Sequence, residues 1–245
     1  MIADAWTVMW KEWRELLLQR GNVRGGWVSL LITIGVFGIF LPLQSGRAWV
    51  ESPALLLVWV WVPLFLVSSV VADAIAGERE RHTLETLLAS RLSDRSILVG
   101  KVGAAMGYGW GLTLVMLTLG LVTVNVVHGH GELVFYPPAT ALGAVLLTLL
   151  GAGLVSGAGV LVSLHAATVR QAAQTLSIAI MVLLFLPVLA LQIVPAEWKG
   201  VVFTALGGLD TFQTVLLLAA VLLVVDLILL LLALARFQRA KLILD

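Results

Sequence analysis

The sequence has no cysteine and few charged residues. Without cysteine, the 245-residue chain has no disulfide, no thiol nucleophile and no thiolate metal ligand. Charged residues make up 12% of the chain and hydrophobic residues 60%, whereas soluble domains have about 25% charged residues. The 15 Lys and Arg nearly balance the 14 Asp and Glu, so the net charge of +1 offers no basic field to nucleic acid. The composition therefore predicts a polytopic membrane protein that binds no nucleic acid.

Common catalytic motifs are also absent. The chain has no G-x-x-x-x-G-K-[ST] phosphate-binding loop, no H-E-x-x-H and no G-x-S-x-G. His128, His130 and Glu132 are three possible zinc ligands within five residues, but so short a cluster is more often a solvated loop. We therefore expect no catalytic residue, no metal site and no cofactor in this chain, and no ATP hydrolysis by it.

Six long, nearly uncharged runs are the main feature that is present. Each is close to the roughly 20 apolar residues that a helix needs to cross a hydrocarbon core about 30 Å thick. Only the sixth run contains a charge, Asp226. The sequence predicts one all-α membrane domain over residues 1–245 with six transmembrane helices. The runs are 25–46, 52–72, 102–127, 139–164, 172–194 and 212–235.

Basic residues are distributed unevenly between the two sides of these spans. One side has only Arg47 and Lys199. Because basic residues are retained in the cytoplasm, the richer side predicts a cell-membrane protein with both termini cytoplasmic. The basic residues of the richer side are Lys11, Arg14, Arg20, Arg24, Arg79, Arg81, Arg91, Arg95, Lys101, Arg170, Arg236, Arg239 and Lys241.

Residues 1–24 form a charged segment with an amphipathic pattern. Between Ile2 and Leu17, apolar residues recur at helical spacing and charged residues lie opposite them. Tryptophan suits the headgroup boundary, because its ring is apolar and its indole N–H is polar. We expect an elbow helix that lies on membrane lipid at the cytoplasmic surface; packing on a neighbouring soluble subunit is the alternative. The expected anchoring residues are Trp6, Met9, Trp10 and Trp13.

The loop at 77–101, between the second and third spans, is the longest polar stretch. After a run of charges, Leu84, Leu87 and Leu88 stand at i, i+3 and i+4, which predicts a short helix with one apolar edge. Ser93 is placed to cap the helix that leads through Lys101 into the third span. A short helix at the membrane surface is suited to docking into a groove, and a solvated charged loop is the alternative.

The order of residues in this loop resembles the cytoplasmic loop of the type 2 ABC transporter permease family. That loop commonly has a Glu-basic-Glu-basic run, then Gly-Thr-Leu-Glu, two Leu, a Ser-Pro-x-Ser turn and a closing Gly-Lys. His82 stands where Gly is usual, and Arg91 stands where Pro is usual. The matching residues are Glu78, Arg79, Glu80, Arg81, Thr83, Leu84, Glu85, Leu87, Leu88, Ser90, Ser93, Gly100 and Lys101.

The resemblance implies a permease subunit of an ATP-driven exporter. In that family the loop helix rests on a separate ABC ATPase subunit, which binds ATP and Mg, and two permease subunits, identical or homologous, form the pathway. The resemblance also implies a partly re-entrant segment on the outside, for which 195–211 is the candidate. The coupling surface would be Glu78–Ser90, with the three leucines as apolar anchors on the ATPase and the charges setting the register.

A rival class is a membrane-embedded scaffold or enzyme that recruits a soluble partner through the same loop. Intramembrane chemistry would need several converging polar residues, and the spans offer one aspartate. If the chain is a permease, spans of mostly Leu, Val, Ala and Gly suit an apolar or amphiphilic cargo better than a hydrated ion.

Two further features of the spans have open interpretations. Asp226 is either part of a translocation path or a hydrogen-bonded residue at a helix contact, because a charge within a membrane is costly. Asp73 is expected to pair with basic residues of the loop. Ridges of small residues allow close helix contacts within one subunit or between two. These ridges are Gly103, Gly107 and Gly111 in the third span and Gly153 and Gly157 in the fourth.

Overall fold

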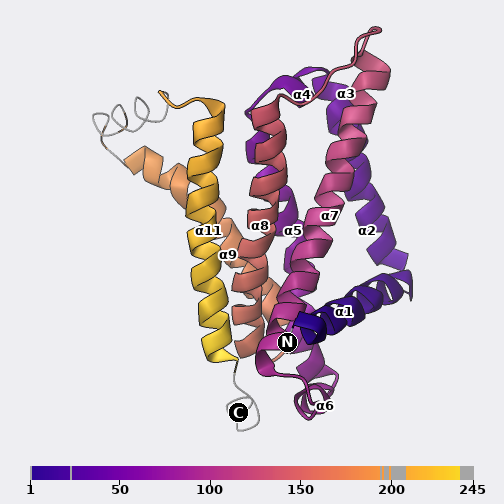
Figure 1. The fold of residues 1–245 in the computed structure, drawn as a ribbon, viewed down its shortest axis with the longest axis vertical. Coiled ribbons are helices and arrows are strands. Elements are labelled where there is room, and N and C mark those ends of the chain that lie inside the picture. Colours follow the sequence, from indigo (N-terminus) through magenta and orange to yellow (C-terminus); the bar gives the residue numbers. More distant parts are fainter. Residues whose placement is uncertain (1, 23, 194, 196–198, 200–207, 238–245) are drawn as a thin grey trace.

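The computed structural model of the chain describes residues 2–22, 24–193, 195, 199 and 208–237, without the side chains of 17–26, 88, 187–188 and 190–191. All regular structure within these ranges is helical, with no strand (Figure 1). Six helical stretches are long and apolar enough to cross a membrane, and each overlaps one predicted run. The predicted all-helical, multi-pass architecture is therefore confirmed. The stretches are Trp27–Ser45, Leu55–Glu80, Asp94–His128, Pro138–His165, Val169–Leu186 and Thr211–Arg236.

The first of these stretches is built from three consecutive elements, whereas each of the others lies within one helix. An α-helix passes through a single π-helical turn into a short helix that ends at Gly46, whose positive φ of 57° favours glycine. The elements in chain order are α1 (Ile2–Asn22), α2 (Arg24–Gly35), η1 (Val36–Phe40), α3 (Leu41–Ser45), α4 (Ala48–Glu51), α5 (Leu55–Glu80), α6 (Leu84–Leu88), α7 (Asp94–His128), α8 (Pro138–His165), α9 (Val169–Ile193) and α11 (Thr211–Arg236).

Local sequence signals explain where several helices begin. The Ser93 hydroxyl accepts a hydrogen bond from the Ser96 N–H at 3.2 Å, so the predicted cap of α7 is confirmed. Pro138 is the first residue of α8, where its missing N–H costs nothing. Asp210 and Gln213 form a reciprocal capping box at the start of α11.

Helices α5 and α8 form the centre of the bundle. In the most apolar 18-residue stretch of each helix, 50% of the residues are buried in α5 and 56% in α8, compared with 11% in α11. Glycines let the two helices approach closely: a Cβ on Gly159 of α8 would lie 2.2 Å from Val71 of α5. The Ser163 hydroxyl of α8 also accepts hydrogen bonds from the N–H groups of Ile75 and Ala76. Helices α2, α9 and α11 flank this centre and expose many apolar side chains.

The two ends of the bundle differ in character (Figure 1). One end carries α6 and the ends of α8 and α11, and we call it the α6 end. Helix α1 crosses the bundle near this end, as an elbow helix at a membrane surface would. The opposite end, which we call the α4 end, carries α4 and the turn after α7. Most of the predicted re-entrant segment 195–211 lies outside the described residues.

Candidate functional site

The loop between α5 and α7 is shorter than predicted, because both flanking helices extend into it. Helix α5 continues to Glu80 and α7 begins at Asp94, so the connection is 81–93 rather than 77–101. Within it, α6 spans Leu84–Leu88, at the position where the leucine spacing predicts a helix. The chain therefore presents a single helical turn between two long helices at the α6 end (Figure 1).

A tight turn at the end of α5 sets the direction of α6. The Thr83 N–H donates to the Glu78 carbonyl at 2.9 Å and the His82 N–H to the Arg79 carbonyl at 3.1 Å. This pair of bonds is a Schellman motif, which needs a left-handed residue just after the helix. His82 supplies it with a φ of 57°. The turn therefore keeps the left-handed bend at a position where the resembled family usually has glycine.

A cluster of two acids and two lysines joins three helices at the base of this turn. The Lys101 ammonium of α7 lies 2.7 Å from a Glu12 oxygen of α1 and 3.2 Å from a Glu78 oxygen of α5. Lys11 of α1 approaches the same Glu78 oxygen at 3.3 Å. The Thr83 hydroxyl, which precedes α6, also donates to the Glu78 carboxylate. We call Lys11, Glu12, Glu78 and Lys101 the ion-pair cluster.

The central pair of the ion-pair cluster, Lys101 and Glu78, is closed to water, whereas Lys11 is exposed and Glu12 is half-buried. Lys101 is 3% exposed and Glu78 is 5% exposed. Partial burial lowers the pKa of Lys11, but Glu12, Glu78 and Glu15 outweigh it and raise that pKa above its ordinary value. Removing one partner of a buried ion pair leaves the other charge uncompensated, which costs about 3–5 kcal/mol. The cluster is therefore a strong constraint on how α1, α5 and α7 sit together.

The other three charged residues of the run Glu78–Arg81 each bind a different part of the chain. Arg79 donates to the Leu164 carbonyl at 3.1 Å and to the Ala166 carbonyl, and so covers the end of α8. Glu80 accepts a hydrogen bond from the Val169 N–H at the start of α9, at 3.2 Å. Successive helical residues point about 100° apart, so consecutive charges at the end of α5 reach different neighbours.

Arg81 completes the run by turning back to Asp73. The guanidinium makes two bonds of 3.1 Å to the two oxygens of the Asp73 carboxylate. The expectation that Asp73 pairs with a basic residue of the loop is therefore confirmed. Burial lowers the pKa of Arg81, but its bonds to Asp73 outweigh that effect and raise the pKa above its ordinary value.

The leucines of α6 do not form one free apolar edge. Leu84 is 7% exposed and belongs to the chain's own core, and Leu87 packs against that core. Leu84 therefore packs inside the chain in this structure and is not part of an exposed edge, while the side chain of Leu88 lies outside the described residues. The outer surface of α6 and the following turn consists of the exposed residues Glu85, Thr86, Ala89 and Arg91.

Helix α1 uses its tryptophans in two ways. Trp6 and Trp10 are about 60% exposed, as expected for residues that face membrane lipid. Trp13 instead donates to the Ala104 carbonyl of α7 at 2.9 Å. Met9 lies over the same helix, where a Cβ on Gly103 would be 3.4 Å from its sulfur. Of the four predicted anchoring residues, two are therefore free and two contact α7.

The glycine ridges pack helices within this chain. A Cβ on Gly100 would lie 2.6 Å from Val8 of α1, and one on Gly107 would lie 2.8 Å from the Trp13 ring. Gly157 of α8 makes the same kind of room for Leu229 of α11, at 3.0 Å. By contrast, no atom lies within 4 Å of a Cβ built on Gly111. Close contact inside one subunit therefore accounts for these ridges, except at Gly111.

Asp226 lies at the contact between α8 and α11. A Cβ on Gly153 of α8 would be 2.5 Å from an Asp226 oxygen, so the glycine makes room for the carboxylate. Its Oδ1 atom is buried and has no hydrogen-bond partner among the described residues. The structure thus places Asp226 against a neighbouring helix, away from the ion-pair cluster.

At the α4 end, Arg47 holds the turn that follows α7. It pairs with Glu132 at 3.2 Å and donates to the carbonyls of His128 and Gly129 at 3.2 and 3.0 Å. In the part of the chain that the structure describes, no three of His, Asp and Glu come together as a metal site would require.

The ion-pair cluster was not predicted from the sequence, although one signal for it exists. Lys101 stands four residues after Ile97, on the buried face of the first turns of α7. Glu78 likewise follows Ala74 and Ile75 on the inner face of α5. A helical projection of each segment would have placed opposite charges on two inward faces. No protein-family model matches the chain, and a search of curated proteins finds no match.

Proposed function

We propose that this chain is the permease subunit of an ATP-driven exporter of the type 2 ABC transporter class. The observation that carries the proposal is the α6 loop. Its residue order resembles that family's loop, and its helix is fixed to the bundle by a Schellman turn and a buried ion-pair cluster. A short helix fixed in this way is able to carry motion into the spans, whereas a loosely held loop would absorb that motion.

In this proposal, the residues of the loop divide into an inner and an outer group. Glu78, Arg79 and Leu84 bind other parts of the same chain and set the position of α6. Glu85, Thr86 and Arg91 are exposed and form the contact with the ATPase. Glu80 and Arg81 are exposed as well, although each also bonds within the chain.

The ion-pair cluster provides a route by which motion of α6 reaches the membrane. Thr83 stands directly before α6 and donates to Glu78 at the end of α5. Glu78 in turn shares Lys101 of α7 with Glu12 of α1. A displacement of α6 on ATPase closure would therefore be felt by three helices together, which is the two-state coupling that alternating access needs.

The pathway is proposed to form between two permease subunits, identical or homologous. A groove of about 690 Å³ lies between α2, α5 and α9. Its walls are mostly apolar, with the hydroxyls of Ser29, Thr33 and Ser69 among them, which favours an amphiphilic cargo. Exposed apolar residues of α9, such as Met181 and Phe185, are available for the second subunit. Asp226 is proposed as a further residue of the translocation path; it lies at the contact between α8 and α11 and does not line this groove.

The α6 end is proposed to be cytoplasmic in the cell membrane, because the basic residues concentrate there. ATP and Mg are then bound by the ATPase subunit, and this chain contributes no catalytic residue. The elbow helix α1 lies on membrane lipid through Trp6 and Trp10.

Affinity purification of the full chain from its native membranes tests the proposal. The wild type is compared with a Glu85→Arg, Thr86→Arg variant of the outer α6 surface and with Glu51→Arg, a matched charge reversal at an exposed residue of the α4 end. We expect a nucleotide-binding ATPase, identified by its sequence and its ATP hydrolysis, with the wild type and Glu51→Arg but not with the double variant.

Two other results would count against the proposal. If all three forms retain the ATPase, α6 is not the contact. If none retains one although each inserts in the membrane, the scaffold or enzyme class becomes the better explanation. The partners recovered would then identify which soluble protein the loop recruits.

A further inference from the structure

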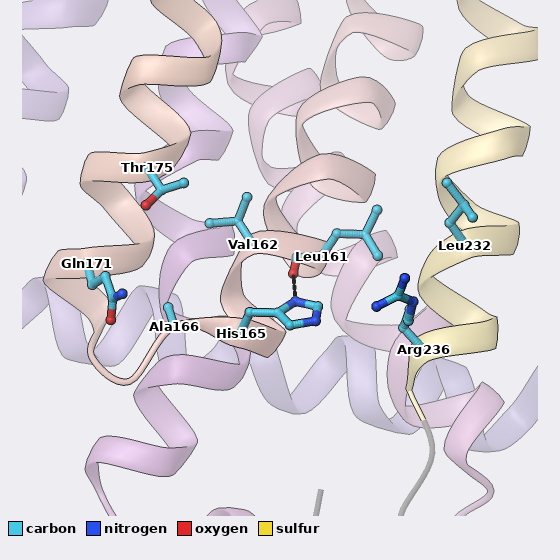
Figure 2. A pocket seen from close by; sticks show the side chains of 8 residues that line it. All are labelled: Leu161, Val162, His165, Ala166, Gln171, Thr175, Leu232 and Arg236. Atoms are coloured by element: carbon cyan, nitrogen blue, oxygen red, sulfur yellow. Dashed lines mark hydrogen bonds between the residues drawn. The ribbon is translucent and has the colours of Figure 1, made fainter. Parts of the chain in front are cut away.

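A pocket of about 530 Å³ opens at the α6 end between α8, α9 and α11 (Figure 2). One side of it is apolar and includes Leu161 of α8 and Leu232 of α11. The other side is polar and carries His165 and Arg236. Figure 2 shows the Arg236 guanidinium directed from α11 towards His165. The pocket therefore suits a ligand that is itself amphiphilic.

The polar residues stand at the level where three helices end. His165 is the last residue of α8, Arg236 is the last of α11, and α9 begins at Val169. Leu161 and Leu232 each lie one turn deeper along the same helices. His165 and Arg236 are also the first ionisable residues after the apolar runs 139–164 and 227–235, so the polar side of the pocket lies at headgroup level and the apolar side at acyl-chain level.

Arg236 has no carboxylate partner among the described residues. The carboxylate of Glu80, the last residue of α5, is bonded to the Val169 N–H at the start of α9. The neighbouring cation Arg79 is bonded to the carbonyls of Leu164 and Ala166, so it neutralises the end of α8 rather than an acid. The side chain of Thr175, on the α9 wall, is exposed to the pocket as well. The electrostatic character of the site is therefore positive.

We propose that this pocket binds an anionic phospholipid, with the headgroup phosphate at Arg236 and the acyl chains along Leu161 and Leu232. A guanidinium offers paired N–H donors to phosphate oxygens, and its charge favours a lipid with net negative charge over a zwitterionic one. The site lies apart from α6 and from the ion-pair cluster. It does not depend on the proposed ATPase partner.

Native mass spectrometry of the purified full chain in detergent tests the site. Phosphatidylglycerol and phosphatidylcholine are titrated in parallel onto the wild type, Arg236→Gln and Arg95→Gln. Arg95 is the matched control, because it is an exposed cation of the α6 end outside the pocket. We expect Arg236→Gln to weaken phosphatidylglycerol binding about fivefold, the factor that corresponds to one basic contact at a membrane surface. Arg95→Gln should bind like the wild type.

A second variant fills the pocket without touching the charge. Thr175→Trp replaces an exposed wall residue, so the fold is expected to be kept while bound phosphatidylglycerol is lost. Equal binding of the two lipids by the wild type would overturn the proposal, as would equal losses in Arg236→Gln and Arg95→Gln. Displacement of the lipid by millimolar inorganic phosphate would also overturn it, because the site would then recognise a soluble anion.

Discussion

The bundle holds two acidic residues against neighbouring helices, and their surroundings differ sharply. Glu78, 5% exposed, accepts bonds from Lys101, Lys11 and Thr83, which come from three other segments of the chain. Asp226 faces Gly153, and its buried Oδ1 has no partner among the described residues. The Glu78 carboxylate therefore holds its neighbours in place through hydrogen bonds. The Asp226 carboxylate only occupies the space that Gly153 leaves beside it.

The two carboxylates differ in whether bonds to the rest of the chain offset the cost of burying them. Several kcal/mol are needed to bury one ion, and a geometrically good pair with further hydrogen bonds offsets that cost. Glu78 meets this condition through its bonds to Lys101, Lys11 and Thr83. Asp226 does not, so the described structure gives no reason for a charge at that position.

The largest expected effect is from breaking the ion-pair cluster. Lys101→Met leaves Glu12 and Glu78 without the cation that joins them. We expect the free energy of unfolding in detergent micelles to fall by about 3–5 kcal/mol. Chemical denaturation of the purified chain measures it.

The double variant Lys101→Met, Glu78→Gln is the control for this experiment. It removes both charges of the most buried pair, so most of the lost stability should return. A double variant as unstable as the single one would show that packing around Lys101, rather than charge, explains the loss.

The next effect tests how closely α1 is held against α7 beside the cluster. In Gly100→Ala the new methyl group would lie 2.6 Å from Val8 and 2.8 Å from the Ala5 carbonyl, so α1 itself must shift. We expect a loss of about 1–3 kcal/mol by overpacking, with faster proteolysis of α1. Gly111→Ala, on the same helix with nothing within 4 Å, should be neutral or slightly stabilising. Equal stability of the two variants would contradict the close contact.

Much of the fold could be predicted from the sequence, because helices and spans are encoded locally. Uncharged runs located all six span-length helices, and the leucine spacing located α6. The helix ends were less accurate: α5 and α7 each extend several residues beyond the apolar run into the charged loop. Charged residues can continue a helix beyond the hydrocarbon core, and hydropathy does not register that continuation.

The site was only partly predictable, because its partners are distant in the chain. Asp73 and Arg81 are eight residues apart, and their pairing followed from local order. Glu12 and Lys101 are 89 residues apart, so their pairing depends on how α1 crosses the bundle. From the sequence, the charged residues of the loop are expected to face outward. In the structure, Glu78, Arg79 and Glu80 instead bond to other helices of the same chain.

A smaller effect is expected at the turn that positions α6. His82 holds a left-handed conformation with φ of 57°, which costs a residue with a side chain roughly 1–2 kcal/mol. His82→Gly should therefore stabilise the chain by about 1 kcal/mol, since glycine adopts this conformation freely. Thermal unfolding measures the change. Thr86→Gly, at an exposed position within α6, is the control and should be neutral or slightly destabilising. A loss of stability in His82→Gly would show that contacts of the imidazole stabilise the fold by more than the left-handed backbone conformation costs.

The smallest change in stability is expected at Asp226. This experiment tests whether Asp226, unlike Glu78, contributes little to the stability of the fold. Asp226→Asn keeps the shape of the side chain and removes its charge, and no described partner loses a bond. We expect the free energy of unfolding to change by less than about 0.5 kcal/mol or to rise, because no ion is then placed within a span. Glu78→Gln, measured beside it, should be clearly destabilising, because Lys101 and Lys11 lose the negative charge that they share. A large loss of stability in Asp226→Asn would mean that this carboxylate is structural too, whereas unchanged stability with reduced transport of an amphiphile in vesicles would place it on the path of the cargo.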